Sequence, residues 1–300
     1  MKHNLRITFI LLAMFLVTQF IGLYVVGHYT EEGNSLPYGL EPPTPETNTE
    51  YSGFFMTIII AFVFAILLFF VLTKLKIEFI LRLWFFVVVT VALAISFLSF
   101  TSDYFTYALI ISSIAALTLA FIKIYRRNFF IHNATELLIY PGIAAVFVPI
   151  LNVYTIIALL ILISIYDMWA VWHSGIMQKM AKYQIDNLGV FSGFFVPYVS
   201  KKTRSQIKMW KKTLSKSELQ KKKIKANIAI LGGGDVVFPI ITAGVMLKTF
   251  GLGSALFVIF GATLGLAYLF SSSEKKKFYP AMPFITAGIF LGMLLCRLIL

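Results

Sequence analysis

The feature that most constrains this chain is a succession of apolar segments, each long enough to cross a bilayer. A helix needs about 20 residues to span roughly 30 Å of hydrocarbon. The chain contains nine such segments, near residues 7–27, 53–73, 79–100, 105–125, 135–151, 153–173, 226–247, 252–271 and 280–299. Composition agrees, because 59% of the 300 residues are hydrophobic and only 13% are charged. The sequence therefore predicts an all-α polytopic membrane protein with nine transmembrane helices.

Basic residues in the connecting segments predict the orientation, because cytoplasmic loops are enriched in Lys and Arg. If the N-terminus lies in the cytoplasm, almost all basic clusters fall on that side, and only Lys248 and Arg297 remain outside. The first exterior loop is instead rich in glutamate. We therefore expect a cytoplasmic N-terminus and a C-terminus outside. Short loops favour a prokaryotic cell membrane over an internal one.

A long connection divides the chain into an N-terminal part, 1–173, a basic cytoplasmic loop, 174–225, and a C-terminal part, 226–300. The second half of the loop, 201–225, is strongly basic, and we expect it to contact anionic lipid headgroups rather than nucleic acid. The segment 189–200 is different, because it is apolar, aromatic and β-branched. It suits an interfacial or extended conformation.

Two acidic residues lie inside apolar spans, whereas nearly all others lie in loops or at span ends. Asp167 lies near the end of the sixth span and Asp235 near the start of the seventh. Consecutive spans run in opposite directions, so both acids fall in the same half of the membrane, at depths that differ by only a few ångströms at about 1.5 Å per helical residue. Since intramembrane charge is costly and marks function, we expect the two side chains to face each other.

Paired carboxyl groups with no buried Lys or Arg to neutralise them can share one proton, because repulsion and desolvation disfavour two charges. Such a pair can hold a water molecule between its members. One carboxylate then acts as general base on that water while the protonated partner acts as general acid. This is the chemistry of aspartic proteases.

Three glycines, Gly232, Gly233 and Gly234, precede Asp235, and Pro239 follows it. Glycine permits non-helical backbone and close approach by another chain, and proline removes a helical hydrogen bond. The sequence therefore predicts that a peptide backbone can reach Asp235. Close packing between helices is the alternative explanation of the glycines.

These residues resemble the presenilin and signal peptide peptidase family of intramembrane aspartyl proteases, and in particular its compact archaeal members. The three matching motifs are Tyr166–Asp167; Gly232, Gly233, Gly234 and Asp235; and Pro280, Ala281, Met282 and Pro283. They correspond to the family's Tyr-Asp, Gly-x-Gly-Asp and Pro-Ala-Leu motifs, on the expected spans of a nine-span chain. Met282 stands where the family usually has leucine, a swap of similar volume.

The resemblance implies an aspartic endopeptidase that hydrolyses peptide bonds in or near transmembrane segments of single-span or signal-peptide-like substrates. It implies that Asp167 and Asp235 are catalytic, and that the other motif residues support the site and bind substrate. A substrate helix must unwind before water can attack, and its exposed backbone must then pair elsewhere. Strand addition satisfies it, and the candidate edges are 189–200 and the backbone before Pro280.

Other functions use some of the same residues. A proton-coupled transporter or ion channel also needs intramembrane carboxyl groups, and a membrane scaffold would not depend on either aspartate. We expect no cofactor and no metal, because the four histidines are isolated near span edges, where interfacial positions are common, and no HExxH motif is present. The sequence leaves the oligomeric state and the bounds of the fifth span open, since Pro141 and Pro149 interrupt that span.

Overall fold

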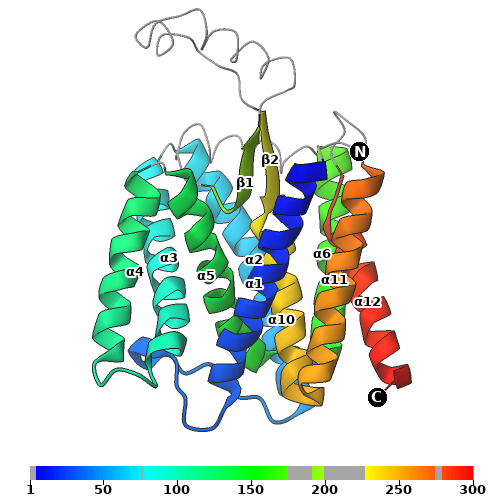
Figure 1. The fold of residues 1–300 in the computed structure, drawn as a ribbon, viewed down its shortest axis with the longest axis horizontal. Helices are drawn as coiled ribbons and strands as arrows, with labels where there is room; N and C mark the ends of the chain where they lie inside the picture. The colour runs from blue at the N-terminus through cyan, green and yellow to red at the C-terminus, as the bar shows by residue number, and fades with distance from the viewer. Residues whose placement is uncertain are drawn as a thin grey trace, which may run out of the picture.

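The computed structural model describes residues 5–75, 77–126, 128–174, 191–198, 227–273 and 279–299. Within these ranges it has nine helices that are long and apolar enough to cross a membrane, which confirms the predicted fold class. They are α1 (Leu5–Thr30), α2 (Asn48–Lys74), α3 (Glu78–Thr101), α4 (Ala108–Tyr125), α5 (Phe129–Phe147), α6 (Val153–Trp169), α10 (Gly233–Phe250), α11 (Leu252–Ser272) and α12 (Met282–Ile299). Figure 1 shows them side by side, with the N- and C-terminal ends at opposite faces of the bundle. Which face is cytoplasmic stays a prediction.

The fifth span begins at Phe129 rather than near residue 135 as predicted. Asn128 caps the helix, because its side chain accepts the backbone N–H groups of Phe130 and Ile131. The α-helix continues through Pro141 and ends at Phe147, where a 3₁₀ turn, Val148–Ile150, contains the second proline. The predicted start was too late because the first turn of α5 carries polar side chains that the fold buries.

The seventh span departs further from the prediction, because its first residues form a strand. β2 (Asn227–Gly232) pairs antiparallel with β1 (Gly193–Tyr198), and α10 begins only at Gly233. The two strands stand beside the N-terminal end of α10 in Figure 1. The expectation that 189–200 contains extended chain is confirmed for the residues of β1. Most of the predicted basic loop, including the lipid-binding candidate 201–225, lies outside the described residues.

Alternate residues of β1 direct their backbone groups toward α5 instead of toward β2. Both the N–H and the carbonyl of Phe195 bond the side chain of Asn133 on α5. Because paired residues in an antiparallel ladder exchange either both hydrogen bonds or neither, Phe195 and its partner Ile230 form a non-hydrogen-bonded pair. The N–H and carbonyl of Ile230 therefore point to the outer edge of β2, away from β1.

The helices pack very unequally. α11 and α12 meet through glycines so closely that a Cβ on Gly261 would clash with the carbonyl of Gly288, and one on Gly292 with the carbonyl of Phe257. Small residues of this kind let membrane helices bring their backbones into contact. By contrast, no residue of α2 from Asn48 to Leu68 is buried. The core therefore lies around α1, α5, α10 and the α11–α12 pair.

Candidate active site

Asp167 lies close to the C-terminal end of α6, just before a short π-helical segment, Ala170–Ser174. Its side chain is buried, with 5% of the residue exposed. The carboxylate Oδ2 accepts the backbone N–H of Met282 at 3.0 Å, and Met282 is the first residue of α12. The positive end of the α12 dipole therefore faces a carboxyl group that the negative end of its own helix would disfavour.

A second contact holds α6 and α12 together next to Asp167. The hydroxyl of Ser164 donates to that of Thr286 at 2.9 Å, and both residues are buried. Met282 itself is 3% exposed and packs into the main core. The predicted Pro-Ala-Met element thus lies directly against the predicted aspartate, and the backbone of the element makes the contact.

Asp235 lies in the first turn of α10 and is 8% exposed. An acidic residue is favoured at this end of a helix, where N–H groups lack helical partners. The two predicted carboxyl groups are close enough for Asp167 to act electrostatically on Asp235. Within the described part of the chain, no salt bridge neutralises either one. The fold therefore brings together two carboxyl groups of the same potential charge.

The route by which Asp235 reaches this position differs from the predicted one. We expected a continuous helix from residue 226, whereas the chain forms strand β2 first and enters α10 only at Gly233. The earlier depth estimate of about 1.5 Å per residue therefore does not apply to 227–232, because a strand rises about 3.3 Å per residue. Asp235 is buried because its turn is covered by neighbouring elements.

The three glycines before Asp235 differ in their surroundings. A Cβ on Gly232 would lie 3.1 Å from Oδ2 of Asp235, and one on Gly233 would lie 2.7 Å from Oγ of Ser192 and 2.8 Å from the hydroxyl of Tyr140. Gly234 is exposed, and its nearest neighbour would be Phe238 at 3.7 Å. Gly233 is thus required by packing, Gly232 is the glycine beside the carboxyl group, and Gly234 has space for a methyl group.

Tyr166 is half-buried, and its side chain packs against aromatic residues instead of against the partners of Asp167. Its ring makes an edge contact with Phe62 of α2, with centroids 5.6 Å apart, and a tilted contact with Trp169. No hydrogen bond of its hydroxyl to another described residue is present. In the third motif, Pro280 is buried, whereas Ala281 and Pro283 are half-buried.

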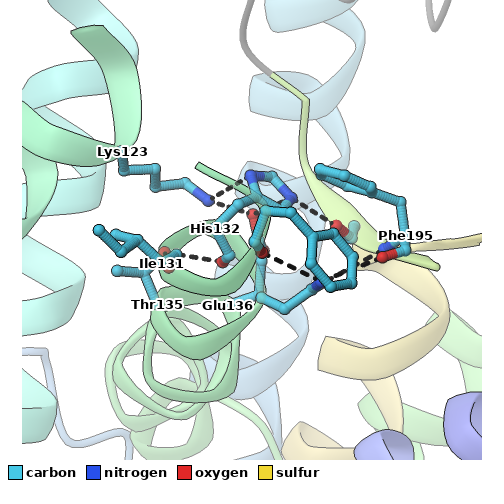
Figure 2. A network of polar contacts seen from close by, with 9 residues as sticks. Lys123, Ile131, His132, Thr135, Glu136 and Phe195 are labelled. Atoms are coloured by element: carbon cyan, nitrogen blue, oxygen red, sulfur yellow. Dashed lines mark hydrogen bonds and ion pairs between the residues drawn. The ribbon is translucent and has the colours of Figure 1, made fainter. Parts of the chain in front are cut away.

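A second group of buried polar side chains was missed by the sequence analysis. Lys123 of α4 lies 2.6 Å from Oε1 of Glu136 on α5, and the exposed fractions of the two side chains are 3% and 1%. Nζ of Lys123 also lies 3.2 Å from Nδ1 of His132. Figure 2 marks this contact with a dashed line. The expectation that the histidines are isolated is wrong for His132, and Glu136, expected at the start of the fifth span, is buried within α5. The signal available was the spacing of those two residues, which places both on one face of a helix.

The chain is similar to known proteins in both sequence and fold. The family described as "Signal-peptide peptidase, presenilin aspartyl protease" matches residues 12–300. Two solved structures of a presenilin family intramembrane aspartate protease share the fold. One, in space group C222, has a TM-score of 0.62 and 17% identity, and the match covers 98% of this chain and 99% of the other. The other, in space group P2, has a TM-score of 0.57 and 18% identity, with 97% of each chain covered. Among curated protein sequences, no significant match is found.

A multi-pass membrane protein with two buried carboxyl groups on neighbouring helices, neither paired with a basic residue in the described ranges, has the architecture of an intramembrane aspartic protease. This chain belongs to the family of signal peptide peptidases and presenilin aspartyl proteases, as the match over nearly its whole length shows. It is therefore an integral membrane enzyme of the aspartic endopeptidase class.

Proposed function

We propose that Asp167 and Asp235 are the catalytic dyad and that they hold one water molecule and one shared proton between them. One carboxylate takes a proton from the water as it attacks the peptide carbonyl, and the protonated partner stabilises the carbonyl oxygen and then protonates the leaving nitrogen. The observation that carries this proposal is the placement of both groups, buried and without a described basic partner, at facing helix ends.

The hydrogen bond from Met282 limits how the shared proton can be placed. Oδ2 of Asp167 accepts an N–H at 3.0 Å, so this oxygen is already engaged in a hydrogen bond that favours its unprotonated form. The remaining oxygen of Asp167 is then the one available to water or to Asp235. The Pro280–Pro283 element thus acts through its backbone, which is why methionine in place of leucine is compatible with the chemistry.

The contacts of β1 argue against substrate binding at the edge considered from the sequence. The edge of β1 considered from the sequence is occupied, because Asn133 bonds both backbone groups of Phe195 and His132 lies 2.9 Å from the carbonyl of Gly193. Pro197 has no N–H to offer. We therefore propose that an unwound substrate adds to the outer edge of β2, at Ile230, which no described residue occupies, and that it continues along β2 toward Asp235.

Substrates of this class are segments of membrane proteins. A transmembrane helix has its backbone groups bonded internally, and opening it inside the membrane leaves them without partners. A strand edge that runs directly into the turn bearing Asp235 meets that need close to the reacting bond. We propose single-span proteins and signal-peptide-like segments as substrates.

The test is mass spectrometry of the products formed by purified enzyme and a single-span substrate in liposomes without any ion gradient. The natural chain should yield discrete products that Asp235→Ala does not, and an inhibitor that mimics the tetrahedral intermediate of aspartic proteases should suppress them. A transporter or channel would give no products under these conditions. Identical product spectra from the natural chain and Asp235→Ala would refute the protease assignment of Asp235.

A further inference from the structure

Side chains of α5 bond directly to the backbone of β1, far along the chain from either aspartate. Nε2 of His132 lies 2.9 Å from the carbonyl oxygen of Gly193. Asn133 accepts the N–H of Phe195 at 3.1 Å and donates to its carbonyl at 3.0 Å. Because these bonds are made to main-chain atoms, they fix the position of the strand whatever side chains it carries.

We propose that Lys123, Glu136, His132 and Asn133 form a positioning site, here called the strand anchor. The anchor fixes β1 against α5, and through β2 it fixes Asp235 relative to Asp167. This proposal rests on the proposed function of the two aspartates. It assigns a role in the reaction to a buried cluster that does not contact the carboxyl groups.

Lys123 and Glu136 determine how His132 bonds the strand. A carbonyl oxygen only accepts hydrogen bonds, so Nε2 of His132 must carry the proton toward Gly193. Nδ1 is then an acceptor, and the ammonium group of Lys123 donates to it at 3.2 Å while it also donates to Glu136 at 2.6 Å. One arrangement of protons satisfies all of these contacts. Figure 2 shows the cluster joining α4, α5 and the strand.

The anchored strand is connected to Asp235 by only a few residues of β2 and α10. Gly193 pairs with Gly232 at the end of the ladder, and Gly232 is the residue that precedes the first turn of α10. Phe194 and Leu231, which pair next to them, are both buried in the main core. A displacement of β1 is therefore passed to the turn bearing Asp235 within a few residues.

α5 also touches this turn directly. Tyr140 follows Glu136 by one helical turn and is almost completely buried. Its hydroxyl would lie 2.8 Å from a Cβ on Gly233, and its ring makes an edge contact with Phe194 of β1. The same helix thus holds the strand pair near its N-terminus and contacts the turn bearing Asp235 about two turns further along.

The primary test compares two substitutions of His132 that differ in reach. Asn places a polar group where Nδ1 of the ring lies, next to Lys123, but cannot reach Gly193, whereas Gln places an amide nitrogen close to the position of Nε2. With a single-span substrate, His132→Asn should lower kcat by about 10- to 100-fold, the size expected for a small misplacement of a reacting group. His132→Gln should retain most of the activity. KM should change little in both, because β2 still offers its edge.

Ser96→Ala supplies the matched control. It removes a buried hydrogen bond of 2.6 Å from Ser96 to the carbonyl of Leu138 on the same α5 helix, but it makes no contact with β1. If the anchor acts only by stabilising α5, His132→Asn and Ser96→Ala should lower kcat equally. Equal kcat values in these two variants would overturn the proposal.

A second measurement reports strand position without catalysis. In a Cys296→Ser background, spin labels at Ala134→Cys and Ile230→Cys, which are both exposed, report the distance between α5 and β2 by pulsed electron paramagnetic resonance. Adding Asn133→Ala should broaden or shift this distribution, and adding Ser96→Ala should not. A drop in kcat with an unchanged distribution would overturn the proposal, since the strands would not have moved.

The two proposals can fail separately. If the natural chain gives no products that Asp235→Ala lacks, the proposed dyad fails, and the distance distributions alone then decide whether α5 holds the strands. If Asp235→Ala abolishes cleavage while His132→Asn cleaves like Ser96→Ala, the dyad stands and the strand anchor is refuted.

Discussion

Two groups of buried charged side chains lie in the described part of the molecule, and their charges are balanced in opposite ways. In the strand anchor, Lys123 and Glu136 neutralise each other at 2.6 Å, and His132 completes the contacts. At the proposed active site, Asp167 and Asp235 carry the same potential charge and have no described basic partner. The first group satisfies its charges within the protein, and the second leaves them to be satisfied by a proton and by reactants.

This difference in charge balance determines which role suits the strand anchor and which suits the aspartate pair. A neutralised, hydrogen-bonded cluster is rigid, and removing one partner leaves an uncompensated charge, so it suits positioning. Two unneutralised carboxyl groups have protonation states that respond to their surroundings, which is what acid–base catalysis requires. A single substitution in either group should therefore change a different property.

The largest effect should come from neutralising one member of the aspartate pair. Asp235→Asn removes a proton donor and acceptor and should lower kcat by at least the 10²- to 10⁴-fold that general acid–base catalysis supplies. It should not lower the free energy of unfolding, because it replaces a buried ionisable group by a neutral one of the same size. Cleavage rates and detergent-to-SDS unfolding of the same preparations measure both. A folded variant with natural activity would contradict the assignment.

The matching substitution in the strand anchor should have the opposite effect on stability. Lys123→Met leaves Glu136 buried and unpaired and should lower the free energy of unfolding by about 3 to 5 kcal/mol. The double variant Lys123→Met/Glu136→Leu should recover much of that loss, because no uncompensated charge remains. Unfolding titrations of the single and double variants form the required cycle. An additive result would show that the two side chains are not coupled.

A smaller effect should come from the glycine that separates the two groups. Gly233→Ala places a methyl group within 3 Å of Tyr140 and Ser192, which should shift the catalytic turn and lower kcat about tenfold. Gly234→Ala meets only Phe238 at 3.7 Å and should lower kcat less. Steady-state kinetics on both variants checks the order. A larger loss in Gly234→Ala would place the critical contact with the substrate instead of with α5.

The smallest effect should come from Tyr166→Phe. The ring contacts with Phe62 and Trp169 are kept, and only a hydroxyl with no described partner is lost. We expect kcat/KM to stay within about threefold of the natural chain, below the roughly 1 kcal/mol typical of a hydrogen bond. A much larger loss, measured under the same conditions, would show that this hydroxyl bonds the substrate or the dyad.

The sequence predicted the nine helices and the aspartate pair because both signals are local. A long apolar run identifies a span by itself, and an acid within such a run stands out. The strand anchor was hidden because Lys123, His132 and Glu136 each lie near a span end, where charge is usually solvated. Their neutralisation depends on how α4 packs against α5, which no pattern along the chain records.

Strand β2 was missed for a different reason. Its central residues, IAIL, are apolar and lead into the apolar residues of α10, so a short strand and the first turns of a helix look alike. β-branched Ile228 and Ile230 and the glycines that follow were the available signals. What decides the matter is the partner strand, which lies across a long connection and pairs only in the folded protein.

The glycine packing of α11 and α12 joins these two helices into one closely packed pair. Met282, whose N–H contacts Asp167, is the first residue of α12. Gly292, which contacts Phe257 of α11, lies ten residues further along the same helix. Membrane helices adjust their tilt to the thickness of the surrounding bilayer. A change in the tilt of this helix pair is therefore carried to the backbone N–H that contacts Asp167.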